Sequence, residues 1–422
     1  MLLGAIADDL TGATDLSLML ARNGMKTIQH IGVPAPGTDF GDAEAVVVAL
    51  KSRTVPAADA IGASRASATA LLNGGAEQIL FKYCSTFDST DAGNIGPVAE
   101  ALLEVTGAPI AIACPAFPAA GRSVYMGHLF IGQVLLSDSS MKDHPLTPMH
   151  DANLVRVLQR QSKCKIGLIP LDVVTKGPAA VQEALAASQA AGYALMIADA
   201  VRDEDLRVLG EALADARLIT GGSGIGIGLP DNFRRLGRIG TTPLPVRMKA
   251  PPGRPVILAG SCSAATRGQV QAAIGAGIPA LKIVPLDIAS GVQTADGVAD
   301  WIIRNTKDLP ALAFSSEAPE EVKRTQEQLG RERAGNLVEH LLAEVSVILR
   351  DVGYSRFIVA GGETSGAVVE ALGAHALRIG PEIAPGVPWT RSIGAPDLAL
   401  ALKSGNFGGK DFFATALGLL DD

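Results

Sequence analysis

At 422 residues the chain is too long for one ordinary hydrophobic core, so its length predicts two domains. A formal net charge of −7 argues against a nucleic-acid partner, because nucleic-acid binding depends on clustered Lys and Arg that contact phosphates. No apolar run approaches the roughly 20 residues of a membrane span, and no signal peptide is recognisable. The four cysteines are too dispersed for a zinc cluster or a disulfide scaffold. We therefore expect a cytoplasmic protein without a membrane partner.

Short apolar, branched runs alternate with alanine-rich segments of helical length in the first half of the chain. This alternation predicts an α/β fold, with βαβ units around a largely parallel sheet flanked by helices. The expected strands are Leu2–Ala7, Thr27–Ile31, Ala45–Leu50, Gln78–Lys82, Ile110–Ala113, Lys165–Ile169 and Ala194–Ala198. The expected helices are Thr14–Asn23, Ala57–Leu72, Ile95–Val105, Asn153–Gln161, Pro178–Ala191 and Glu204–Ala214.

A proline-rich segment at residues 240–255 interrupts this rhythm and predicts a linker. We place a boundary near residue 245, which gives one domain over residues 1–245 and a second over residues 246–422. The second domain is again expected to hold a largely parallel sheet. Its expected strands are Val256–Ala259, Ala280–Val284 and Phe357–Ala360, and its expected helices are Ala264–Ala276, Arg333–Leu349 and Ser365–Leu372.

The segment Ile6–Asp15, IADDLTGATD, places two carboxylates directly after the first predicted strand. In an open α/β sheet, ligands bind outside the carboxyl ends of the strands. Asp8 and Asp9, followed by a glycine that lets a ligand approach the backbone, therefore indicate a polar binding site. The alternative is that Asp8 faces solvent and that Thr11 or Thr14 only caps the next helix.

Charged and hydroxyl residues also follow other predicted strands of the first domain. Because the carboxyl ends of parallel strands meet at one edge of a sheet, these side chains would converge on one crevice. Arginine and lysine there suit an anionic substrate, and carboxylates suit sugar hydroxyls, one of them as a proton acceptor. Each residue alone also fits a loop charge or a helix cap. The candidates are Asp8, Asp9, Arg53, Lys82, Ser85, Thr86, Asp88, Asn94 and Arg122.

Two segments of the second domain combine a strand, glycines, hydroxyls and a helix start: VILAGSCSAATRGQ at Val256–Gln269 and FIVAGGETSG at Phe357–Gly366. Unpaired N–H groups and the dipole of a helix N-terminus suit phosphate, so the pair predicts a nucleotide-phosphate site. Such turns are also frequent in α/β folds without a ligand. A third turn, KSGNFGGK at Lys403–Lys410, either closes over a nucleotide or forms a surface hairpin.

Other nucleotide signatures do not occur in the sequence. No G-x-x-x-x-G-K-[ST] motif is present, which excludes a P-loop enzyme. The glycine run Gly221–Gly228 misses the register of G-x-G-x-x-G and follows a late strand of the first domain. It therefore predicts a tight turn that leads into a helix, with an interdomain site as the alternative.

Five motifs together resemble the four-carbon acid sugar kinases: IADDLTGATD, Ser52–Arg53, KYCSTFDST…GNIGP at Lys82–Pro97, GSCS…T at Gly260–Thr266, and GGETSG at Gly361–Gly366. The resemblance covers nearly the whole chain. It implies an acid-sugar-binding N-terminal domain, a nucleotide-binding C-terminal domain and an active site in the interdomain cleft. The Lys82 segment is similar to the branch that phosphorylates the 4-hydroxyl of 3-oxo-tetronates with ATP in sugar-acid catabolism, whereas D-threonate and D-erythronate kinases tend to carry a different version.

Residues and resemblance together give a set of expected roles, with ATP and Mg²⁺ as cofactors and a sugar acid as substrate. Asp9, or second to it Asp88, is expected to accept the hydroxyl proton. The expected substrate-binding residues are Asp8, Arg53, Lys82, Ser85, Thr86, Asn94 and Arg122. The expected ATP-binding residues are Ser261, Ser263, Gly361, Gly362, Glu363, Thr364 and Gly405. The sequence does not identify the Mg²⁺ ligands or the oligomeric state, for which a homodimer is one option.

Two other functions fit the sequence less well than a kinase. A phosphatase with an aspartyl nucleophile needs Asp-x-Asp after the first strand, whereas here the acids are adjacent and Leu10 occupies the third position. A two-lobed, non-catalytic sugar-acid sensor has no need of two phosphate-binding turns.

Overall fold

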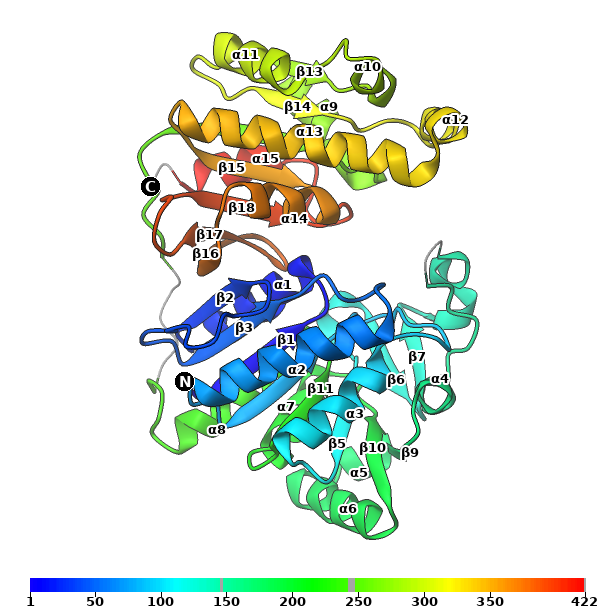
Figure 1. Ribbon diagram of the computed structural model, residues 1–422. Coiled ribbons are helices and arrows are strands. Elements are labelled where there is room, and N and C mark those ends of the chain that lie inside the picture. The colour runs from blue at the N-terminus through cyan, green and yellow to red at the C-terminus, as the bar shows by residue number, and fades with distance from the viewer. Residues whose placement is uncertain (145–146, 242–246, 421–422) are drawn as a thin grey trace. The chain divides into compact units, whose positions relative to one another are not determined.

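The computed structural model in Figure 1 describes residues 1–144, 147–241 and 247–420. The chain forms two compact units, Met1–Leu244 and Pro245–Asp422, each of which is described by itself. The boundary predicted near residue 245 falls among residues 242–246, outside the described residues. No helix in the described part of the chain is long and apolar enough to cross a membrane.

The first unit is built on a parallel sheet in the order β2-β3-β1-β4-β11-β5-β10-β9. β1, β3 and β4 are buried at every position, as expected for strands covered by helices on both faces. Ala7 of β1 pairs with Ala49 of β3 and Lys82 of β4, so these three strands end level with one another. The strands are β1 (Leu3–Ala7), β2 (Thr27–Ile31), β3 (Ala45–Ala49), β4 (Gln78–Lys82), β5 (Ala111–Cys114), β9 (Lys165–Ile169), β10 (Tyr193–Ala198) and β11 (Leu218–Gly221).

Helices connect these strands, and α2 and α3 pack side by side (Figure 1). The helices are α1 (Leu10–Arg22), α2 (Ala57–Asn73), α3 (Ile95–Thr106), α4 (Leu154–Gln161), α5 (Leu171–Val174), α6 (Pro178–Ala190), α7 (Asp203–Ala212) and α8 (Leu229–Arg235). Short 3₁₀ helices are η1 (Pro118–Ala120), η2 (Leu136–Asp138), η3 (Ser140–Asp143) and η4 (Ser223–Ile227). The glycine run Gly221–Gly228 is buried and leads through η4 into α8, in agreement with the predicted turn into a helix.

A small antiparallel sheet lies between β5 and α4 and was not predicted. It consists of β6 (Arg122–Tyr125), β7 (His128–Ile131) and β8 (Val134–Leu135). Strands of two to four residues are too short to show a reliable alternation of apolar and polar positions, which explains the omission.

The second unit holds a sheet in the order β13-β14-β12-β15-β18-β17-β16. The first five strands are parallel, as predicted, whereas β17 and β16 add an antiparallel edge that the sequence did not indicate. The strands are β12 (Arg254–Ala259), β13 (Ala280–Lys282), β14 (Leu312–Phe314), β15 (Tyr354–Ala360), β16 (Ala376–Ala384), β17 (Val387–Ser392) and β18 (Ala399–Lys403). The helices are α9 (Ala264–Gly275), α10 (Pro285–Ala289), α11 (Ala295–Asn305), α12 (Pro319–Leu329), α13 (Arg331–Asp351), α14 (Gly362–Ala371) and α15 (Phe412–Gly418).

Candidate functional site

The first helix begins directly after β1, four residues earlier than the predicted start at Thr14. Asp9 is its N-cap, and Asp9 Oδ1 accepts a hydrogen bond from the Gly12 amide at 3.1 Å. Thr11 donates its hydroxyl to Asp9 Oδ2 at 2.8 Å. The cap is therefore Asp9 itself and neither of the threonines weighed for that role, and this fixes the Asp9 carboxylate at the edge of the sheet.

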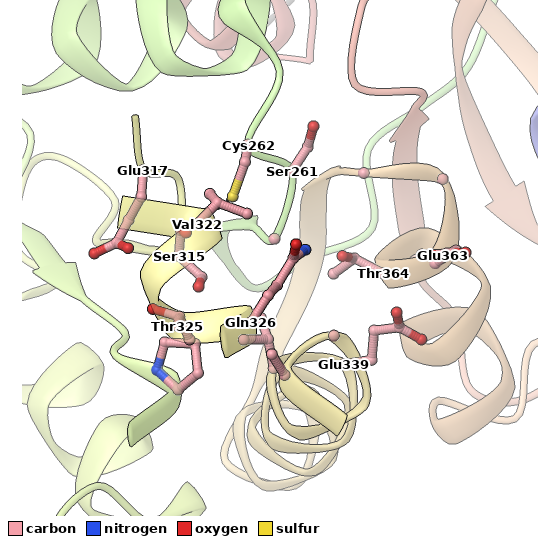
Figure 2. A pocket seen from close by; sticks show the side chains of 17 residues that line it. Ser261, Cys262, Ser315, Glu317, Val322, Thr325, Gln326, Glu339, Glu363 and Thr364 are labelled. Atoms are coloured by element: carbon pink, nitrogen blue, oxygen red, sulfur yellow. Dashed lines mark hydrogen bonds between the residues drawn. The ribbon is translucent and has the colours of Figure 1, made fainter. Parts of the chain in front are cut away.

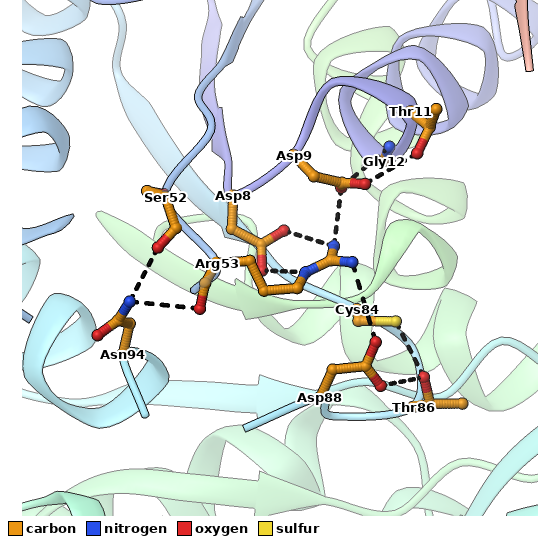
Figure 3. A network of polar contacts seen from close by, with 10 residues as sticks. All are labelled: Asp8, Asp9, Thr11, Gly12, Ser52, Arg53, Cys84, Thr86, Asp88 and Asn94. Atoms are coloured by element: carbon orange, nitrogen blue, oxygen red, sulfur yellow. Dashed lines mark hydrogen bonds and ion pairs between the residues drawn. The ribbon is translucent and has the colours of Figure 1, made fainter. Parts of the chain in front are cut away.

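Arg53 connects the carboxylates that follow neighbouring strands (Figure 3). Its Nε and Nη2 atoms donate to the two oxygens of Asp8 at 2.9 and 2.8 Å, a bidentate pair. Nη2 also donates to Asp9 Oδ1 at 2.8 Å, and Nη1 lies 3.9 Å from Asp88 Oδ2. The turn that carries Arg53 is held in place because the Asp8 carbonyl accepts the amides of Ser52 and Arg53.

The two adjacent acids have pKa values shifted in opposite directions. Burial raises the pKa of Asp8 above the ordinary value, against the opposing charge of Arg53. Burial also acts to raise the pKa of Asp9, but the charges of Arg53 and Lys82 and the hydrogen bonds from Thr11 and Gly12 outweigh it and lower that pKa. Pairs of titratable groups separated in this way are typical of acid–base sites.

The loop after β4 brings Asp88 to this network. Phe87 is fully buried, has a positive φ of 54° and packs edge-on against Tyr83 at 5.4 Å between ring centroids. A positive φ in a bulky residue is strained, so burial of this ring holds the loop in an unusual conformation. Thr86 then donates to Asp88 Oδ1 at 2.5 Å and lies 2.9 Å from the Cys84 sulfur.

Lys82 places an ammonium against the first turn of α1. A Cβ atom on Gly12 would lie only 2.1 Å from Lys82 Nζ, so any larger residue at that position would displace the ammonium. Lys82 is nearly buried, yet within the described residues no acceptor forms a hydrogen bond with its Nζ. Its charge acts on Asp8 and Asp9 and is not consumed by a close ion pair.

The other residues predicted for this site are Asn94, Ser85 and Arg122. Asn94 donates its side-chain amide to the carbonyls of Ser52 and Val55, both at 2.8 Å, and so supports the turn that carries Arg53. Ser85 is half-buried in the loop after β4. Arg122 begins β6 and donates to the Ala120 carbonyl of its own turn, so this contact does not join it to the Arg53 network.

The second unit contains a cavity of about 450 Å³ at the carboxyl ends of β12, β14 and β15 (Figure 2). Its lining includes both predicted phosphate turns and one wall from α12 and α13. The lining residues are Gly260, Ser261, Cys262, Pro285, Ser315, Glu317, Val322, Thr325, Gln326, Ala334, Gly335, Val338, Glu339, Gly361, Gly362, Glu363 and Thr364.

Glycines let three turns meet at this cavity. A Cβ atom on Gly260 would lie 2.2 Å from Thr364 Oγ1, and one on Gly405 would lie 2.3 Å from Ser261 Oγ. Gly361 has a φ of 138° and precedes α14, where its amide donates to the Lys403 carbonyl at 2.9 Å. The turn after β18 therefore lies beside the phosphate turns and is not the surface hairpin weighed as its alternative.

The predicted nucleotide residues divide between the cavity wall and a layer behind it. Ser261 and the Gly361–Thr364 turn line the cavity. Ser263 caps α9 and donates its hydroxyl to the Gly405 carbonyl at 2.6 Å, which links two of the turns from behind.

Sequence reasoning did not find the α12–α13 wall. α12 has no buried residue, and its sequence is strongly charged, so neither an apolar stripe nor a glycine motif pointed to it. Cys84 and Lys403 belong to the KYCSTFDST and KSGNFGGK motifs, but neither motif predicted a role for them.

Two family models match the chain, one within each unit. A family model described as a sugar-binding N-terminal domain matches residues 3–229, which include the Arg53 network. A model described as a nucleotide-binding C-terminal domain matches residues 256–413, which include the cavity.

Similar proteins extend over the full length of the chain. A 3-oxo-tetronate kinase from Cupriavidus necator is 56% identical over 99% of this chain and 96% of its own length. One from Haemophilus influenzae is 41% identical over 99% of this chain and 100% of its own. A solved structure from Haemophilus influenzae matches with a TM-score of 0.82 and 41% identity, covering 99% of this chain and all of that one.

Proposed function

The chain belongs to the four-carbon acid sugar kinase family, and on this premise we propose that it transfers the γ-phosphoryl group of ATP to the 4-hydroxyl of a 3-oxo-tetronate. The sugar acid is assigned to the first domain and ATP to the second. The observation that carries the proposal is the cavity flanked by Ser261 and the Gly361–Thr364 turn, because helix N-termini with nearby hydroxyls suit phosphate.

Asp9 is the proposed proton acceptor. Its side chain is 27% exposed, compared with 9% for Asp8 and 10% for Asp88, so it is the most accessible of the three carboxylates. Its Oδ2 accepts one hydrogen bond, from Thr11, which leaves a lone pair for a substrate hydroxyl. Asp88, held by Thr86, is the second candidate.

Lys82 is the proposed cation for the substrate carboxylate or the transferring phosphoryl group. Arg53 was expected to share this role, but its Nε and Nη2 donors are engaged by Asp8 and Asp9 and only Nη1 remains. We therefore assign Arg53 mainly to the positioning of the acids. Catalysis of phosphoryl transfer consists largely of such positioning and of charge neutralisation.

Cys84 supports the assignment to the 3-oxo-tetronate branch. Burial raises the pKa of its thiol to about 11, so the side chain is neutral at physiological pH. It donates or accepts a single hydrogen bond with Thr86, beside the Arg53 network. The resemblance implies aspartate at this position in D-threonate and D-erythronate kinases, so the neutral thiol is the feature of this loop that matches the 3-oxo-tetronate branch.

Glu363 is the proposed Mg²⁺ ligand in the nucleotide domain. It is exposed at the first turn of α14 and lines the cavity next to the phosphate turn. Mg²⁺ is typically held by one or two carboxylates together with substrate phosphates, which fits this position. When bound, the ion would neutralise phosphate charge.

The test is ADP release by the purified protein against a panel of four-carbon acids with Mg-ATP. We expect turnover with a 3-oxo-tetronate and a 4-phosphate product. Turnover with D-threonate or D-erythronate instead would reassign the substrate, and tight sugar-acid binding without ADP release would favour a sensor. The cytoplasmic location, the homodimer and the interdomain cleft stay predictions.

A further inference from the structure

Lys403 is a buried lysine behind the nucleotide turns, without an assigned role. It ends β18 and its side chain is fully buried. Nζ donates to Thr266 Oγ1 at 3.0 Å and to the Gly405 carbonyl at 3.1 Å. Its own carbonyl accepts the Gly361 amide, so one residue touches two of the glycine turns.

The groups that face this ammonium are uncharged. Thr266 comes from α9, Gly405 from the adjoining turn, and the Phe412 ring from α15, with its centroid 5.8 Å from Nζ. The neighbour on β15 is Ala360. Within the part of the chain that the structure describes, no carboxylate forms an ion pair with Lys403.

Apart from the proposed Mg²⁺, the cavity lining supplies no cation to the phosphates. Lys282 lies beside the lining, but its ammonium is paired with Glu317 at 2.7 Å. The cavity lining contains three glutamates, Glu317, Glu339 and Glu363, and no lysine or arginine. Arg267, also on α9, donates to the carbonyls of Cys262 and Glu317, on the rim of the cavity. A buried ammonium without a counter-ion is costly, and an anionic ligand nearby would offset that cost.

We propose that Lys403 is a positioning residue for ATP, whose ammonium holds the Gly405 carbonyl in the turn and supplies positive charge to the phosphates from the layer behind Ser261 and Ser263. The proposal rests on the assignment of ATP to this cavity. Burial lowers the pKa of Lys403 to about 8, so a phosphate ligand that raises it would bind with proton uptake near that pH.

The proposal is tested by nucleotide binding without sugar acid, comparing wild type with Lys403→Met. Methionine keeps much of the aliphatic stem and removes the charge and the donors. We expect the Kd for ATP to rise about ten- to a hundredfold, whereas the Kd for adenosine, which has no phosphate, changes less than threefold. KM for ATP should rise while KM for the sugar acid does not. Lys307→Met, at an exposed lysine of the same unit, is the matched control for the lost charge and should bind both ligands like wild type.

A merely structural lysine would give a different result. Equal weakening of ATP and adenosine, or unchanged ATP affinity in Lys403→Met, would overturn the proposal. If that variant does not fold, calorimetry on wild type in buffers of different ionisation enthalpy still decides: we expect proton uptake on ATP binding at pH values near 8, above the titration range of phosphate. No proton uptake would count against Lys403. Wild type that binds ATP but releases no ADP would contradict the proposed function alone.

Discussion

At the scale of single residues, the contacts of Arg53 distinguish the two adjacent carboxylates, Asp8 and Asp9. Its bidentate contact fixes Asp8, while Asp9 also caps α1 and remains the more exposed carboxylate. Two adjacent residues of one motif therefore differ: Asp8 is engaged by the arginine, whereas Asp9 is the proposed proton acceptor.

This division predicts the effect of Asp9→Asn. Loss of a positioned base should lower kcat by about 10²–10⁴-fold. Asparagine is an N-cap of similar quality but loses the ion pair with Arg53, so the melting temperature should fall while the protein still folds. Steady-state ADP release and thermal unfolding measure the two effects, with Asp88→Asn as the comparison. A kcat within a few-fold of wild type would remove Asp9 from the mechanism and leave Asp88 as the candidate.

Lys403 gives a prediction for the pH dependence of stability. Its pKa is about 8 in the folded protein and 10.5 ordinarily, so between these values the unfolded chain binds more protons. The free energy of unfolding should therefore rise with pH across this window, by roughly 3 kcal/mol at most. Urea unfolding at several pH values should show this rise in wild type and not in Lys403→Met. Identical slopes in the two proteins would show that Lys403 is not the titrating group.

At the scale of elements, one motif of the proposed nucleotide site needs glycine at one position and not at another. Gly361 has a positive φ, and a Cβ atom there would lie 2.8 Å from Thr364 Oγ1. Gly366, in the same motif, lies inside α14 with nothing within 4 Å of a Cβ atom. The same substitution should therefore have opposite consequences at the two positions.

We predict that Gly361→Ala raises KM for ATP and destabilises the protein, because alanine is strained at this φ. Gly366→Ala should leave KM for ATP unchanged and stabilise α14 by about 0.5–1 kcal/mol, since alanine favours a helix over glycine. Chemical unfolding and initial rates check both variants. Equal effects would mean that the motif has no special backbone requirement at Gly361.

The same elements show how far sequence reasoning reaches. The predicted bounds of β2, β4 and β9 agree with the structure to the residue. β4 and β9 have apolar centres, whereas β2 combines two β-branched isoleucines with polar residues. The phosphate turns were predicted because their glycines and hydroxyls are local signals. That Arg53 and the two acids converge was predicted from their positions after parallel strands, but their pairing joins residues 44 and 45 positions apart and is seen only in the fold. The α12–α13 wall has no local signature and was not predicted.

At the scale of the whole molecule, each unit has a hydrophobic core within its own residues. In the first unit a cluster contains residues between Leu2 and Ile239, and in the second unit a cluster contains residues between Ile257 and Leu420. No residue is common to both. Each unit is thus stabilised by its own buried apolar residues and, under the proposed function, binds its own ligand.

Two cores with two ligands predict ligand-specific thermal transitions in the full-length protein. Binding to the folded state stabilises by about 2.7 kcal/mol when the free ligand is at 100 times its Kd. In differential scanning calorimetry, ATP should raise the transition of residues 246–422 and a 3-oxo-tetronate that of residues 1–245, each with little effect on the other. Lys403→Met should lose most of the shift with ATP and keep the shift with sugar acid. If both ligands shift one common transition equally, the two cores unfold as one unit. If the sugar acid shifts only the transition that ATP shifts, the assignment of the ligands to the two domains is contradicted.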